Sequence, residues 1–91
     1  MLDKKVTRDE NVAWRIIGDE AVLLSAEDSS VHSLDAVGTR IWELCDGEKT
    51  VSEIVDQVVS EFEVDRETAE KDVVEFIEEL MNKEKSLVTL S

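Results

Sequence analysis

The spacing of the apolar residues changes once along this chain, near Leu34, and this change constrains the fold more than any other feature. Before Leu34 the apolar residues form short runs between polar turns, which is typical of strands. After Leu34 they recur every three or four residues, which is typical of amphipathic helices. The chain has 91 residues, enough for one domain with one modest core. The sequence therefore predicts a small sheet followed by a helical part.

Three strands are predicted in the first third of the chain. Residues 13–17 and 21–25 are apolar runs on either side of the polar turn 18–20, a pattern typical of a β-hairpin. A second polar turn at 26–30 leads into a third short strand at 31–34. Consecutive strands joined by short turns pair antiparallel. These segments therefore predict a three-stranded antiparallel meander.

Three helices are predicted after the meander. Each begins at a residue whose side chain can accept hydrogen bonds from free backbone amides, namely Asp35, Thr50 and Asp65. The first helix ends at Asp46-Gly47, the second opens with a capping box completed by Glu53, and the third extends to about Lys83. The fold class is therefore α+β: a three-stranded antiparallel β-meander followed by three helices, resembling a winged helix-turn-helix.

The third helix has an apolar face that is wider than usual. Its predicted core face comprises Ala69, Val73, Phe76, Ile77 and Leu80. Ile77, together with Val74 and Met81, is displaced to one side of the stripe that the other four residues form. They are either additional core or the wall of a binding groove, and both interpretations stay open at this point.

Domain limits follow from the same patterns. We expect a flexible N-terminal segment at 1–12, one domain at 13–84 and a tail at 85–91, in which residues 86–90 could pair as a short strand. The N-terminus lacks a secretion signal and no apolar run is long enough to span a membrane, which predicts a cytoplasmic protein.

The net charge of −13, from 23 acidic and 10 basic residues, argues against binding to nucleic acid. The third helix region, residues 66–84, contains seven acidic and three basic residues, which is the wrong sign for a helix that enters a DNA groove. Such a chain attracts basic partners instead. The sequence leaves open two general functions, that of a winged-helix DNA binder and that of a protein–protein interaction module.

No pattern indicates an enzyme, a metal site or a cofactor. The single cysteine, Cys45, lies on the predicted buried face of the first helix and is interpreted as a core residue. The single histidine, His32, lies in the third predicted strand and is interpreted as a passive surface residue. A phosphate-binding glycine loop, a Ser-His-Asp set and an HExxH motif are all missing from the sequence.

Several segments in order resemble the PqqD-like family, also called the RiPP recognition element. They are AWRIIGDEAVLLS, VHSLDAVGTRIWELCDGEKTVSEIVDQV and DVVEFIEELMNKE. The residues that match the family pattern are Leu34, Asp35, Gly38, Ile41, Trp42, Asp46, Gly47, Thr50, Val51, Glu53, Ile54, Asp72 and Val73. Members closest to pyrroloquinoline quinone biosynthesis have a Pro-Glu-rich stretch after the hairpin, where this chain has SAEDSS, so the pathway stays open.

The resemblance implies a non-catalytic protein that binds the leader segment of a ribosomally made precursor peptide. The leader would add as a strand beside Val31, His32, Ser33 and Leu34, against the third helix. A separate modifying enzyme, often a radical SAM enzyme, would then act on the peptide. On the helix we expect Val74, Ile77 and Met81 to line the groove. Glu70 and Glu78 would lie on its rim and favour a Lys- or Arg-bearing peptide. The sequence leaves open whether the protein is a monomer or a dimer.

Overall fold

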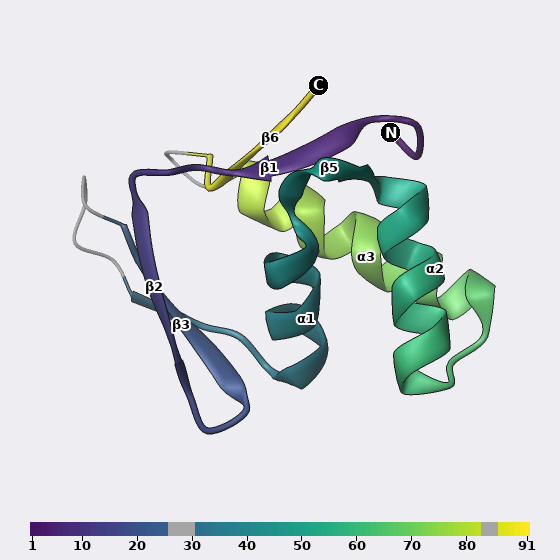
Figure 1. Cartoon of the computed structure of the whole chain (residues 1–91), viewed down its shortest axis with the longest axis horizontal. Coiled ribbons are helices and arrows are strands. Elements are labelled where there is room, and N and C mark those ends of the chain that lie inside the picture. The colour runs from purple at the N-terminus through teal and green to yellow at the C-terminus, as the bar shows by residue number, and fades with distance from the viewer. Residues whose placement is uncertain (26–30, 83–85) are drawn as a thin grey trace.

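The computed structural model describes residues 1–25, 31–82 and 86–91, which form six strands and three helices. In chain order the elements are β1 (Lys5–Arg8), β2 (Val12–Ile17), β3 (Glu20–Ser25), β4 (Val31–Ser33), α1 (Ala36–Leu44), β5 (Asp46–Thr50), α2 (Val51–Phe62), α3 (Arg66–Met81) and β6 (Val88–Leu90). Figure 1 shows the β2–β3 hairpin to one side of the helices and β1, β5 and β6 together along another edge. The predicted α+β class is confirmed.

The predicted meander is the sheet with strand order β2-β3-β4. Its hairpin register runs from Val12 opposite Ser25 to Ile17 opposite Glu20. Gly18 in the turn has a φ of 67°, a left-handed conformation that glycine adopts without steric cost. The predicted turn at 26–30 lies outside the described residues.

A second sheet, with strand order β5-β1-β6, differs from the sequence-based expectation. Residues 1–12 were expected to be flexible, whereas the structure pairs β1 with two strands and buries Val6 completely. Lys5–Arg8 contains one apolar residue, too few to predict a strand. Asp46–Thr50 was expected only to end a helix and instead forms β5. The proposed strand in the tail is present as β6.

The predicted caps of all three helices are confirmed. The Asp35 side chain accepts a hydrogen bond from the Gly38 amide at 2.7 Å, and Asp65 accepts one from the Thr68 amide at 2.7 Å. The Thr68 amide lowers the pKa of the Asp65 carboxyl, because it stabilises the ionised form. Thr50 and Glu53 form the reciprocal capping box of α2.

Arg8 joins the second sheet to the end of α1. Its guanidinium donates to the backbone carbonyls of Trp42 at 3.0 Å and Glu43 at 2.8 Å, which lie in the last turn of the helix. The same group lies 5.3 Å from the ring centroid of Trp14 on β2. Arg8 therefore connects β1, α1 and the hairpin.

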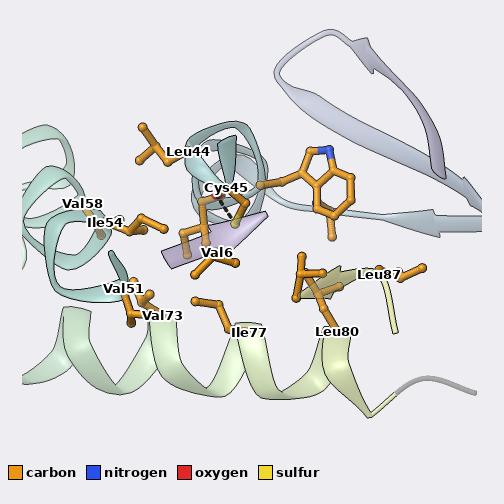
Figure 2. Packing of buried hydrophobic residues seen from close by; sticks show 14 of the residues in the cluster. Val6, Leu44, Cys45, Val51, Ile54, Val58, Val73, Ile77, Leu80 and Leu87 are labelled. Atoms are coloured by element: carbon orange, nitrogen blue, oxygen red, sulfur yellow. Dashed lines mark hydrogen bonds between the residues drawn. The ribbon is translucent and has the colours of Figure 1, made fainter. Parts of the chain in front are cut away.

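The core lies between the three helices and β1. Figure 2 shows three side chains of α3 in this core: Val73 beside Val51, Ile77 below Val6, and Leu80 beside Leu87. Trp42, Ile54 and Ile77 are among its largest fully buried side chains. One face of α3 is therefore fixed by packing, and a ligand can meet this helix only at the edges of that face or on its other faces.

Candidate functional site

Strand β4 forms an edge of its sheet, because within the described part of the chain it pairs only with β3. The Leu34 amide donates to the Ala21 carbonyl at 2.9 Å. Bonded and non-bonded pairs alternate along an antiparallel ladder, so His32 is the next residue whose backbone faces β3. The backbone groups of Val31 and Ser33 consequently face away from the sheet. Among the described residues no other strand pairs with them, so this side of β4 can take a further strand.

A groove of about 400 Å³ lies between this edge and α3. Its lining residues are Val31, His32, Ser33, Leu34, Asp35, Phe76, Glu79 and Leu80. The walls combine residues of β4 with apolar side chains from α3, and Asp35 and Glu79 each add a carboxylate. Such an arrangement can hold an extended peptide by main-chain hydrogen bonds and can select its side chains.

The structure brings four of the predicted site residues together in this groove. They are Val31, His32, Ser33 and Leu34, the β4 side of the prediction. Val31 is exposed, with 59% of its surface accessible, whereas Leu34 is buried at 9%. These four residues therefore lie together along the β4 side of the groove.

The helix side of the predicted site is arranged differently. Ile77 is completely buried in the core, so it cannot line an open groove in this structure. Val74 and Met81 are half-buried against the core, and Val74 borders another hollow together with Glu70. Glu78 borders a third hollow on the outer side of α3.

Instead of the residues that the sequence predicted, the groove is lined on its α3 side by Phe76, Glu79 and Leu80. They share one stripe of α3, because residues three and four apart lie on the same side of a helix. The sequence analysis assigned Phe76 and Leu80 to the core. Leu80 is buried at 3% exposure and borders both the core and the groove, and Phe76 is only partly buried. Periodicity identified the apolar face but could not show which edge of it β4 leaves uncovered.

Thr39 holds the junction between β3, the end of β4 and α1. The residue is buried, with 6% of its surface exposed. Its hydroxyl accepts a hydrogen bond from the Ala21 amide at 2.8 Å and donates one to the Leu34 carbonyl at 3.4 Å. The hydroxyl thus bridges two backbone groups that would otherwise bond to each other if the ladder continued. Thr39 therefore fixes where β4 leaves its partner strand.

We expect Thr39→Val to lower the free energy of unfolding by about 1–3 kcal/mol. Valine has nearly the same size as threonine, but it leaves two buried backbone groups without their hydrogen-bond partner. Thr39→Ser keeps the hydroxyl and should cost less than half as much. Urea unfolding of the three proteins measures the difference. Equal stability of the valine and serine variants would contradict this role of the hydroxyl.

Gly38 lies directly beneath Phe76. A Cβ at this position would lie 3.1 Å from Phe76 Cε1 and 3.1 Å from the Asp35 carboxylate. We expect Gly38→Ala to displace the Phe76 ring within the groove. The melting temperature should stay within about 5 °C, since the better helix propensity of alanine offsets the crowding. Peptide affinity, measured by calorimetry, should fall severalfold, and an unchanged affinity would show that the ring position does not matter.

The single cysteine, Cys45, is buried in the core. Burial raises the pKa of the Cys45 thiol to about 12, so the thiol stays protonated. It donates to the Ile41 carbonyl inside the core, as the dashed line in Figure 2 marks. In residues 1–25, 31–82 and 86–91 no three His, Cys, Asp or Glu side chains are grouped so that they could hold a metal ion. Across the same residues, none of the helices has the length and apolar character needed to cross a bilayer.

The charge on α3 does not suit the DNA-binding alternative. Its exposed carboxylates are Glu67, Asp72, Glu75, Glu78 and Glu79. Two of the hollows on this helix are bordered mainly by glutamates. This surface would repel a phosphate backbone.

Comparison with known proteins finds a family and solved structures that this chain resembles. The model of the family described as coenzyme PQQ synthesis protein D matches residues 20–84. A PqqA binding protein of Rhodopseudomonas palustris (strain BisB5) is 33% identical over 70 residues, which are 77% of this chain and 60% of that protein. The chain thus spans less than two thirds of the length of this relative.

Two solved structures are similar over almost their whole length. TbiB1, in complex with the TbiA(beta) leader peptide, is 41% identical with a TM-score of 0.80, covering 90% of this chain and 93% of that one. Lasso peptide synthetase B1, complexed with the leader peptide, is 19% identical with a TM-score of 0.79, covering 93% and 98%. At 19% identity, the similarity to lasso peptide synthetase B1 shows a shared fold alone.

Proposed function

Because the chain belongs to the family of coenzyme PQQ synthesis protein D, we propose that it binds the leader segment of a ribosomally made precursor peptide. The leader adds as a strand to the open edge of β4 and lies against α3. The chain then presents the peptide to a separate modifying enzyme, such as a radical SAM enzyme, and carries out no chemistry itself.

One observation carries this proposal. The backbone groups of Val31 and Ser33 face away from β3, and a groove with apolar walls from Phe76 and Leu80 lies directly beside them. An edge of three residues is short enough to avoid indiscriminate aggregation. The side-chain groove therefore adds specificity and further affinity to the few main-chain hydrogen bonds that so short an edge can make. The TbiB1 complex, with a relative 41% identical to this chain, supports the same assignment.

The proposal is tested with candidate leader peptides translated from short open reading frames beside the gene. Each peptide is titrated into the full chain by calorimetry, with the TbiA(beta) leader peptide as a reference ligand. We expect at least one candidate to bind with a dissociation constant in the micromolar range or tighter, about −8 kcal/mol. In spectra of the ¹⁵N-labelled chain, the amide shifts should concentrate on β4 and on α3 near Phe76. Tight binding with shifts confined to another surface would contradict the proposal.

A further inference from the structure

The groove beside β4 has a neighbour on the other side of Phe76. A second hollow of about 300 Å³ lies between α1 and α3. Its lining residues are Asp35, Val37, Gly38, Ile41, Asp72 and Phe76. Asp35 and Phe76 border both hollows, so the two lie side by side.

The two hollows are arranged along one ridge of α3. Asp72, Phe76 and Leu80 follow i, i+4, i+8 spacing and therefore lie one above the other. Eight helical residues span about 12 Å, a distance that about four residues of an extended peptide also cover. A peptide paired with β4 would thus reach the second hollow within about four residues.

The second hollow combines apolar walls with two carboxylates. Ile41 is 1% exposed and Val37 is half-buried, and with Phe76 they form the apolar part. Asp35 and Asp72 are both exposed beside them. In the described part of the chain, neither carboxylate is in an ion pair, since the ion pairs there use other acids. Asp35 keeps its hydrogen bond to the Gly38 amide.

This combination matches a long cationic side chain. Lysine and arginine place a hydrocarbon stem on apolar surface and keep the charged head among polar groups. A purely apolar side chain would fill the walls but would gain no attraction from the two carboxylates. A second copy of this chain is disfavoured, because it also carries a net charge of −13.

We propose that this hollow is a subsite for a Lys or Arg side chain of the bound peptide, about two to four residues from the segment paired with β4. This inference rests on the proposed function, and it identifies the kind of leader that the groove selects. It also replaces the expected acidic rim of Glu70 and Glu78, which border other hollows, by Asp35 and Asp72.

The test uses selection from a random dodecapeptide display library on the immobilised full chain. The same selection is run on a variant with Asp35→Asn and Asp72→Asn. Asparagine keeps the helix cap at position 35, so the variant should fold. A second variant, Glu75→Gln, removes one negative charge from α3 outside both hollows.

On the wild type and on the Glu75→Gln variant, we expect enrichment of Lys or Arg at one fixed distance from an apolar segment. The double variant should lose that enrichment while it still selects apolar segments. A selected lysine peptide should bind about three- to tenfold more weakly to the double variant at low salt. Replacing its lysine with norleucine should weaken binding to the wild type by a similar factor, and the difference should shrink at high salt.

The outcomes distinguish a failure of the proposed subsite from a failure of the proposed function. Peptides selected without a positional preference for Lys or Arg would overturn the subsite and leave strand addition intact. A preference that persists in the double variant would also overturn the subsite. Failure of the wild-type chain to select any peptide, together with failure to bind any candidate leader, would overturn the proposed function itself.

Discussion

Ser33→Pro is expected to weaken leader binding by at least about thirtyfold, or about 2 kcal/mol. Proline removes the Ser33 amide that faces away from β3, and its ring occupies the space that the added strand must enter. The fold should change little, since proline is tolerated on an edge strand where its nitrogen faces outward. Calorimetry gives the affinity, and urea unfolding should show a stability within about 1 kcal/mol of the wild type.

Two matched variants make the expected loss specific to the backbone. Ser33→Ala changes only the side chain and should leave the affinity within about twofold, because main-chain groups supply the binding. His32→Pro removes an amide that faces β3 and should lower the stability markedly, because a ladder hydrogen bond is lost. Retained affinity in the Ser33→Pro protein would mean that the leader does not pair with β4.

Ile77→Ala is expected to lower the free energy of unfolding by about 2–5 kcal/mol. Ile77 is completely buried in the hydrophobic core, so the substitution leaves a cavity that the packed core fills only in part. This is a large fraction of the total stability of a small domain, which is about 5–15 kcal/mol. Urea unfolding measures the loss, and peptide affinity should remain near the wild-type value once it is corrected for the folded fraction.

Val74→Ala is the control for the loss of stability that we expect from Ile77→Ala. Val74 lies on the same helix but is only half-buried, so we expect a loss below about 1.5 kcal/mol. Equal losses for both variants, or a large direct loss of affinity in Ile77→Ala, would support the groove as the sequence analysis drew it. Such a result would also place α3 in a different rotation from the one in the structure.

Local signals were sufficient for much of the fold. The caps at Asp35, Thr50 and Asp65 depend on contacts within a few residues, and the alternation of apolar runs located β2, β3 and β4. The second sheet was not predictable in this way. Its strands β1 and β5 have mostly polar sequences, and they are held by pairing with distant segments.

The candidate site shows the same division between local and distant information. The sequence located the edge at Val31–Leu34, because a short strand between a turn and a helix cap is a local pattern. It could not determine whether Ile77 or Phe76 faces that edge. The two residues are adjacent on α3, and their burial depends on how α3 packs against α1, α2 and β1. Only the tertiary arrangement distinguishes the core side of the apolar face from its groove side.

Amide hydrogen exchange at β4, with and without the tightest-binding candidate leader, tests the central claim most directly. The His32 amide faces β3, so its exchange should be slow in both states. The Val31 and Ser33 amides face outward and should exchange quickly in the free chain. At saturating peptide the account predicts strong protection of Val31 and Ser33. Unchanged exchange at both amides in the saturated complex would contradict strand addition at this edge.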